Sequence, residues 1–247
     1  MESNIIMKAL IYILIYCTCL YSEIIEEFHY KTRFKSLRVG ETKISIISNN
    51  QDSKMNKILT IESSSNKLID LIYKLRHFST IIMDQTDFSL IAITQKLQQG
   101  GYIDSYNATI DYNQSNIYYQ NMQDNKNKVH IIIPFKGKVY DPFSIIYYLR
   151  NLNLNIGDQF TFQSYSKKKL RDITLFIIKK EEIETPFATS ECLVVVPQST
   201  DKKYLLKHQG EMKIWLTADS LLIPIKIQQK MKHGTMELIL RDYVTKK

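Results

Sequence analysis

The chain has 247 residues, a net charge of +8 and three cysteines, and it is long enough to bury a core as one domain or two packed halves. Two of the cysteines lie in the first 22 residues, so a chain that loses this segment keeps Cys192 alone and cannot form an internal disulfide. The five histidines lack metal-ligand spacing and the seven glycines form no phosphate-binding loop, which argues against a metal site and a nucleotide-binding fold.

An apolar run over residues 9–21 follows Lys8 and precedes an acidic cluster that begins at Glu23. This layout is typical of a secretory signal peptide, and the run is shorter than the about 20 apolar residues that a bilayer-spanning helix needs. We therefore predict a cleaved signal peptide over residues 1–22 and a single mainly-β domain over residues 23–247. An uncleaved anchor and lipid attachment at a cysteine of the run stay open as alternatives.

From residue 27 onward the dominant hydrophobic period is two, which is typical of half-buried strands. Residues 28–34, for example, place aromatic and threonine side chains on one face and mostly basic side chains on the other. Val39 and Gly40 follow, and we predict that they form the turn to a second strand. The same pattern predicts strands over residues 43–48, 57–62, 78–83, 90–98, 102–112, 116–120, 159–165, 170–180, 187–196, 210–217, 223–232 and 235–243.

Two segments instead show helical spacing. Residues 66–74 carry leucine and isoleucine side chains at helical intervals, and Ser65 or Asn66 would serve as the N-cap. The stronger signal begins at Asp141, an N-cap residue followed by Pro142 at the first helical position and by an apolar stripe. Both helices are available as lids for the apolar face of a sheet.

The order of these elements predicts the fold class. Many strands joined by short polar turns, with two convincing helices, indicate a large curved antiparallel sheet or half-barrel with one or two short helices. Its apolar face must curl or be covered in order to leave water. Residues 120–128, which are polar apart from Met122, predict a mobile loop that divides the sheet into two parts.

No residue cluster indicates catalysis. Cys192 lies in an apolar strand sequence, which favours a buried structural thiol over a nucleophile. The adjacent carboxylates Glu181 and Glu182 would point to opposite faces of a strand, so we interpret them as solvated turn charges and predict no enzyme. Lysine clusters such as residues 167–169 are typical of solvated turns, with attraction to anionic lipid headgroups as the alternative reading.

An ordered set of short motifs resembles one bacterial family. The motifs are DPFSIIYYLR (141–150), LNIGD (154–158), GEMKIWLTAD (210–219), IPIKI (223–227) and HGT (233–235). The set is similar to domain of unknown function 3108, a family of exported envelope proteins. The resemblance implies a signal peptide, a location in the periplasm or at the periphery of the outer membrane, and a curved sheet similar to the lipoprotein-carrier half-barrels. It implies no known reaction and no cofactor.

Three residues within these motifs are candidate ligand-binding residues. Alternation along the strand places Trp215 on one face and aliphatic side chains on the other, where a core anchor is favoured over a ligand platform. Tyr147 lies on the apolar stripe of the second helix. Arg150 lies near the C-terminus of that helix, where it would complement the helix dipole or pair with a buried carboxylate.

The leading functional hypothesis is an exported, non-enzymatic envelope protein whose curved sheet binds a hydrophobic ligand or a lipidated partner. The alternative is a structural or scaffold domain that binds an envelope protein or a cell-wall polymer through its polar face and edges. Because an exported protein seldom meets nucleic acid, we interpret the many tyrosines as sheet residues rather than as base-stacking platforms.

Overall fold

The computed structural model describes residues 24–49, 56–123, 130–200 and 211–245. The predicted signal peptide over residues 1–22 lies outside the described residues. So does most of the predicted loop over residues 120–128, of which Gln120 and Asn121 end a strand. Among the described residues, no helix is long and apolar enough to cross a bilayer.

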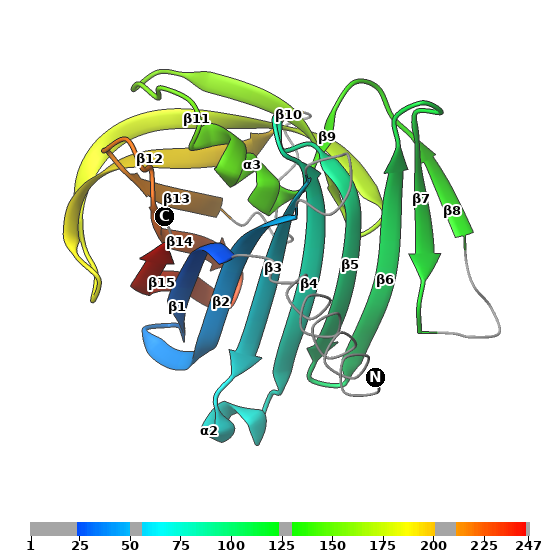
Figure 1. The fold of residues 1–247 in the computed structure, drawn as a ribbon. Helices are drawn as coiled ribbons and strands as arrows, with labels where there is room; N and C mark the ends of the chain where they lie inside the picture. Colours follow the sequence, from blue (N-terminus) through cyan, green and yellow to red (C-terminus); the bar gives the residue numbers. More distant parts are fainter. Residues whose placement is uncertain (1–23, 50–55, 124–129, 201–210, 246–247) are drawn as a thin grey trace, which may run out of the picture.

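Fifteen strands in the described residues form one sheet, in the order β8-β7-β6-β5-β4-β3-β2-β1-β15-β14-β13-β12-β11-β10-β9 (Figure 1). The first half comprises β1 (Ile24–Phe34), β2 (Leu37–Asn49), β3 (Asn56–Ser65), β4 (Leu75–Asp84), β5 (Leu90–Gln99), β6 (Tyr102–Asp111), β7 (Asn116–Asn121) and β8 (His130–Pro134). The second half comprises β9 (Val139–Tyr140), β10 (Gln159–Ser166), β11 (Lys169–Glu184), β12 (Thr189–Ser199), β13 (Glu211–Thr217), β14 (Pro224–Met231) and β15 (Gly234–Thr245).

The two halves are meanders that meet at the pairing of β1 with β15. This pairing is antiparallel and runs from Glu26 opposite Thr245 to Phe34 opposite Met236. Every other neighbouring pair is also antiparallel except β9 with β10, which is parallel. The first and last described strands therefore lie side by side in the middle of the sheet, as the blue and red arrows of Figure 1 show.

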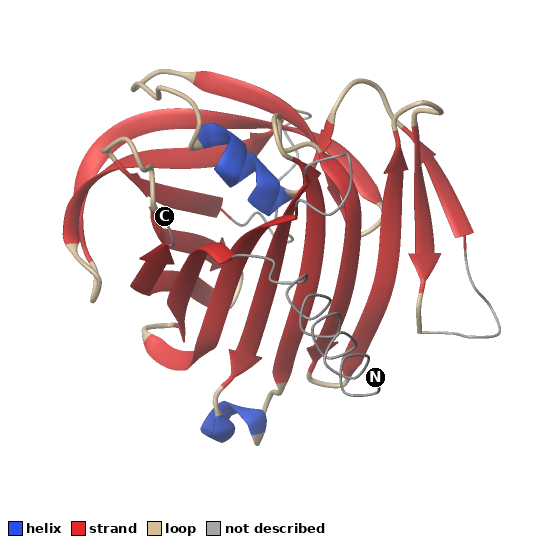
Figure 2. Cartoon of the chain, in the orientation of Figure 1, coloured by secondary structure: helices blue, strands red, loops and turns tan. Residues whose placement is uncertain are grey.

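The helix α3 (Pro142–Leu149) lies within the curve of this sheet (Figure 2). Ile145, Ile146 and Leu149 pack with aliphatic side chains of β12, β13 and β14. On its other side, Tyr147 contacts the ring of Phe28 in β1, with the ring centroids 6.2 Å apart. The helix thus contacts apolar side chains of both meanders and covers part of each, and the predicted curved antiparallel sheet with short helices is confirmed.

Local sequence explains where α3 begins. Asp141 accepts a hydrogen bond from the backbone N–H of Phe143 at 2.7 Å, and the Ser144 hydroxyl oxygen accepts one from the backbone N–H of Asp141 at 2.9 Å. This reciprocal capping leaves few unpaired N–H groups in the first turn, and Pro142 has none to pair. The N-cap predicted at Asp141 is therefore present.

The predicted turn at Val39 and Gly40 is wrong. The first hairpin instead turns at Lys35 and Ser36, whose φ values are +48° and +67°, and Gly40 lies within β2. Gly40 is needed there because a Cβ atom would lie 2.1 Å from the carbonyl oxygen of Ser64 in β3. The glycine thus marks a close approach of two strands rather than a turn.

Three further expectations need correction. The helix predicted over residues 66–74 is only the four-residue α2 (Lys67–Asp70), which projects beyond the sheet at the β3–β4 hairpin and covers nothing (Figure 1). Its apolar face has no core to pack against, so tertiary burial does not extend it. Glu181 and Glu182 lie within the long strand β11, not in a turn. The strands β8 and β9 were not predicted, because both are short and lack clear alternation.

Replacing Gly40 with alanine should lower the free energy of unfolding by about 1–3 kcal/mol, because the added methyl group collides with the backbone of β3. Gly101→Ala is the matched control, since nothing lies within 4 Å of a Cβ atom at that position. Denaturant unfolding of both variants measures the difference. Equal stability of the two variants would contradict the close approach.

Asp141 predicts a pH dependence of stability. Burial raises the pKa of its carboxyl to about 7, although the backbone N–H groups of Phe143 and Ser144 oppose the rise. In an unfolded chain the pKa is about 3.9, so the folded state binds the proton more tightly. The resulting stabilisation is fully present below about pH 4 and is lost as the pH rises through about 7.

Asp141→Asn keeps a capping acceptor but does not titrate. Its free energy of unfolding should therefore increase relative to that of the parent chain between pH 4 and pH 7, as denaturant unfolding at stepped pH would measure. Asp141→Ala should in addition lose about 1 kcal/mol at every pH, because it removes the cap. A parent-to-Asn difference that stays constant over this range would refute the titration of Asp141.

Candidate functional site

A partly open pocket of about 420 Å³ lies between the two meanders of the sheet. One side of its lining comes from β1 to β5 and the other side from β13, β14 and β15. The two sides are continuous, because Thr32 of β1 pairs with Leu238 of β15. Phe143 of α3 and Lys167 of the β10–β11 turn complete the lining. The pocket therefore exists because the sheet curls and brings the inner faces of both meanders together.

The wall from the second meander is apolar. Its large side chains are Met212 in β13, Ile227 in β14, and Met236 and Leu238 in β15. The strand register places Ile227 opposite Leu238, while Gln229 lies between Met212 and Met236. Methionine side chains are flexible and adapt to irregular apolar shapes, so this wall suits a hydrocarbon chain.

The wall from the first meander carries a row of hydroxyl groups. The Thr42 hydroxyl donates a hydrogen bond to the Ser63 hydroxyl oxygen at 2.9 Å, and the hydroxyl oxygens of Thr32 and Thr42 lie 3.1 Å apart. With the Thr42 proton directed at Ser63, the Thr32 hydroxyl must donate to Thr42. The hydroxyl row ends at Ser63, and the next residues across the sheet are His77, opposite Ser63, and Leu97, opposite His77.

Among the described residues, Lys167 is the one lysine or arginine that lines the pocket. Burial lowers the pKa of His77, and the nearby charge of Lys167 lowers it further, while a hydrogen bond with Gln95 opposes these effects. The ammonium group of Lys167 lies 5.9 Å from the ring centroid of Tyr102. No carboxylate is among the described residues that line the pocket. The site therefore combines an apolar wall with a basic, hydroxyl-lined wall and favours an anionic group of a ligand.

The predicted candidate Arg150 lies outside this pocket, in a buried ion pair. Its Nη1 and Nη2 atoms donate to Oε2 and Oε1 of Glu26 at 2.6 and 2.8 Å, and its Nε donates to the Leu221 carbonyl oxygen at 3.0 Å. The side chains of Arg150 and Glu26 are 9% and 16% exposed. The alternative of a buried carboxylate partner, left open by the sequence, is the one that occurs.

The ion pair fixes the charge of Glu26. Burial would raise the pKa of this carboxyl, but hydrogen bonds and charge from Arg150, with a hydrogen bond from the Tyr243 hydroxyl, hold it below its usual value. The guanidinium group also lies 5.4 Å from the ring centroid of Phe28. Because all its groups are paired, we interpret this cluster as structural: it joins α3 to β1 and β15.

The other two candidate residues are buried away from the pocket. Tyr147 packs against Phe28 and Arg150, and burial raises the pKa of its hydroxyl well above the usual value. Trp215 donates its indole N–H to Glu181, and the ammonium group of Lys226 lies 5.0 Å from its ring. The indole lies on the opposite face of β13 from Ile214 and Leu216, in agreement with the predicted alternation.

Cysteine and metal chemistry can each be checked against the described residues. Cys192 is buried, and burial raises the pKa of its thiol to about 11, so the thiolate is rare near neutral pH. The described part of the chain holds no group of three histidine, cysteine or acidic residues that could bind a metal ion.

Two other pockets, of about 640 and 960 Å³, lie over the outward-facing side chains of β1 to β6 and at the far hairpin turns.

Sequence reasoning did not assign a role to the residues that line the pocket. It placed Thr32 on the buried face of the first strand, but Ser63, His77 and Met212 became neighbours only through strand register. A hydroxyl residue on an otherwise aromatic face is the one local signal that pointed here. The lysines at residues 167–169 are exposed, as the interpretation of solvated lysines predicts, and Lys167 also lines the pocket.

Comparisons with known proteins concern the whole chain rather than this pocket. A family model described as a protein of unknown function, DUF3108, matches residues 29–241. No curated protein matches the chain. Among solved structures, the beta-barrel-like protein of domain of unknown function DUF1849 from Brucella abortus is similar, with a TM-score of 0.56 and 8% identity over 91% of this chain and 98% of that one. At this identity, the likeness shows the fold alone.

Arg150→Met should lower the free energy of unfolding by about 3–5 kcal/mol, because it leaves the Glu26 carboxylate buried without its cation. Lys180→Met is the matched control, since Lys180 and Glu191 form an exposed pair whose loss costs under about 1 kcal/mol. Equilibrium denaturation measures both losses. Similar losses in the free energy of unfolding for the two variants would show that the buried pair contributes no more stability than the exposed pair.

Proposed function

We propose a ligand-binding function for this chain, which belongs to the DUF3108 family of proteins of unknown function. The ligand is amphipathic: a hydrocarbon part contacts the methionine-rich wall, and an anionic group approaches Lys167 and His77. The observation that carries the proposal is the pocket between the meanders, with one apolar and one basic, hydroxyl-lined wall. Its volume of about 420 Å³ falls within the range of roughly 300–1,000 Å³ that small-molecule sites occupy.

Binding without turnover is the simplest chemistry for this lining. Ser63 and His77 are the residues nearest in type to a nucleophile and a base, and they lie opposite each other in the sheet. The Ser63 hydroxyl oxygen already accepts a hydrogen bond from Thr42, and the lining contains no carboxylate among the described residues to orient the imidazole. We therefore propose a non-enzymatic carrier or sensor rather than a hydrolase.

The proposal also includes export of the protein from the cytoplasm. The apolar run over residues 9–21, with Lys8 before it, supports a signal peptide and thus a site of action in the cell envelope. Lipids and lipidated proteins are the abundant amphipathic molecules of that compartment, and they match the chemistry of the two walls.

A scaffold function is the second candidate, and one observation favours it. The groove of about 640 Å³ on the outward face of β1 to β6 is lined by alternating charges, including Lys31, Glu41, Lys43 and Glu62. Such a polar surface suits another protein or a polymer rather than a lipid. A specific envelope partner that is cross-linked through this groove, from a protein whose inner pocket binds no ligand, would favour this candidate.

The ligand proposal is tested with 11-(dansylamino)undecanoic acid, an anionic hydrocarbon probe whose emission rises and shifts to the blue in apolar surroundings. The chain should bind this probe, and Met236→Trp should abolish binding, because the larger side chain fills the pocket beside the apolar wall. Met236 belongs to neither packed core cluster, so the fold should tolerate the change. Met122→Trp, at an exposed position outside the pocket, is the matched control.

Charge reversal tests the orientation of the ligand. Lys167→Glu should weaken binding of the anionic probe by about tenfold, which corresponds to roughly 1.4 kcal/mol. The methyl ester of the probe should bind this variant as it binds the parent chain. Lys136→Glu, an exposed change away from the pocket, should have no effect. Absence of probe binding by the parent chain, or full binding by Met236→Trp, would overturn the proposal.

A further inference from the structure

The β3–β4 hairpin ends in an apolar projection, residues 66–74, which we call the apolar knob. Leu68, Leu71 and Ile72 are 76%, 84% and 86% exposed there. They are the three most exposed large apolar side chains in the described part of the chain. Exposed leucine and isoleucine side chains that cluster on one projection indicate a contact surface, whereas isolated ones do not.

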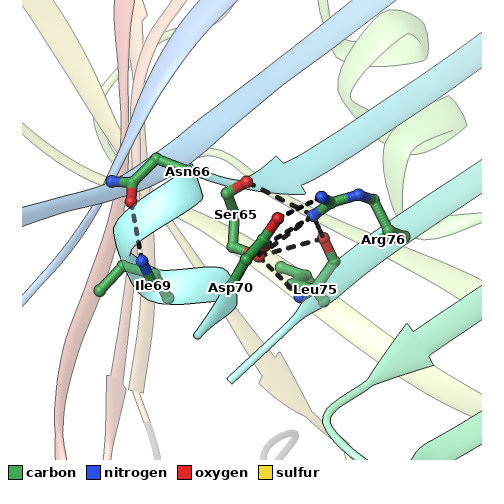
Figure 3. Close-up of polar contacts among 6 residues, drawn as sticks. All are labelled: Ser65, Asn66, Ile69, Asp70, Leu75 and Arg76. Atoms are coloured by element: carbon green, nitrogen blue, oxygen red, sulfur yellow. Dashed lines mark hydrogen bonds and ion pairs between the residues drawn. The ribbon is translucent and has the colours of Figure 1, made fainter. Parts of the chain in front are cut away.

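A network of hydrogen bonds and one ion pair holds the knob in shape (Figure 3). Asp70 accepts hydrogen bonds from the Ser65 hydroxyl at 2.5 Å and from Nη1 of Arg76 at 2.9 Å, and Nη2 of Arg76 binds its other oxygen. The Ser65 hydroxyl oxygen also accepts the backbone N–H of Leu75 at 2.7 Å. The hydrogen bonds from Arg76 and Ser65 lower the pKa of Asp70 to about 2, so its charge stays paired at neutral pH.

Neighbouring hairpins fasten the knob on both sides. Asn66 donates its side-chain amide to the Arg38 carbonyl oxygen at 2.9 Å and accepts the backbone N–H of Ile69 at 3.0 Å. On the β5 side, the backbone N–H of Gly100 donates to the Lys74 carbonyl oxygen at 2.8 Å, and the Tyr73 ring lies against Gly100. Because these contacts already fix the backbone of the knob, binding through its leucine and isoleucine side chains would cost little further conformational entropy.

A fourth exposed apolar side chain lies at the same end of the sheet. Leu37, next to the β1–β2 turn, is 70% exposed, the fourth-highest value for a large apolar side chain among the described residues. Figure 1 shows the β1–β2 turn and α2 together at the lower edge of the sheet. The four most exposed apolar side chains of the described chain therefore share one end.

The charges at this end complement an anionic surface. The described turns at this end carry the exposed lysines Lys35, Lys67, Lys74, Lys168 and Lys232. Asp70 is the one carboxylate within these described turns, and Arg76 neutralises it. In the adjoining strands lie Glu41, which pairs with Arg38, and Asp104, which lies beside Tyr102. Exposed apolar side chains ringed by lysine are the pattern of an interfacial membrane anchor.

We propose that the apolar knob docks this end of the protein onto an anionic lipid surface, with Leu68, Leu71 and Ile72 entering the boundary between headgroups and acyl chains. The lysines contact the headgroups, and each contributes additional attraction. The ligand pocket reaches the same end, because Leu75 and Gln99 line it and lie beside the knob and Gly100. Docking builds on the proposed function by placing the pocket at a lipid source, but it does not require a bound ligand.

Flotation with vesicles tests the proposal on the full chain. Wild-type protein should float with vesicles of phosphatidylcholine and phosphatidylglycerol at 3:1, and less so with pure phosphatidylcholine or at high salt. The triple change Leu68→Ser, Leu71→Ser and Ile72→Ser should reduce binding by about tenfold or more. Because these side chains are exposed, the triple variant should retain the parent melting temperature.

The matched control is Ile132→Ser, Ile156→Ser and Ile178→Ser, which removes three other exposed isoleucines outside the knob. It should bind as the parent chain does. Lys67→Glu with Lys74→Glu should weaken binding to the anionic vesicles by roughly fivefold per lysine. Emission from Leu71→Trp should shift to the blue when vesicles are added, whereas the native Trp215 is already buried.

Three outcomes would overturn the proposal. They are absence of flotation with anionic vesicles, equal flotation of the knob and control triple variants, and no emission shift for Leu71→Trp. A knob variant that binds vesicles normally but loses a specific protein partner would instead assign the surface to that protein. The probe assay on the pocket is independent, so docking and ligand binding can fail separately.

Discussion

The pairing of β1 with β15 is the interaction on which the rest of the structure depends, because it joins two meanders that are far apart in the chain into one curled sheet. The buried ion pair of Arg150 with Glu26 lies at this junction, and Tyr243 of β15 donates its hydroxyl to the same carboxylate. One cluster therefore holds β1, β15 and α3 together. These contacts join residues 124 and 217 positions apart in the chain, so they are among the long-range contacts that a local pattern does not reveal.

The pocket follows from this closure. Each meander alone would leave its inner face open to water, and α3 is too short to cover both. When the meanders curl toward each other, aromatic and aliphatic side chains fill most of the interior. The pocket lies where Thr32, Thr42 and Ser63 place hydroxyl groups in the interior instead of large apolar side chains. The polar wall is consistent with a binding function, since a purely structural interior would gain stability from apolar side chains there.

The charges of the protein are divided between two roles. Inside, Arg150 and Glu26 are paired, and Asp141 caps α3 through backbone N–H groups. At the lower end, lysines surround leucine and isoleucine side chains that a soluble surface would normally bury. The paired Asp70 and Arg76 hold that projection in shape without adding net charge. Five exposed lysines therefore lie at the end of the sheet that we propose to meet a lipid surface.

The sequence alone determined the strand periodicity, the start of α3 at Asp141 and the family resemblance, because alternation, capping and short motifs are local signals. It misplaced the first turn at Gly40, because the close approach of Gly40 to Ser64 is a contact between different strands. It made α2 too long, because the sequence does not show that this helix has no packing partner. It also left Arg150 with two readings. Only the tertiary structure decided between them, and it set Ser63 opposite His77 and brought Met236 into the lining of the same pocket. Strand register and curl arise from contacts across the sheet, and a pattern along one strand does not contain them.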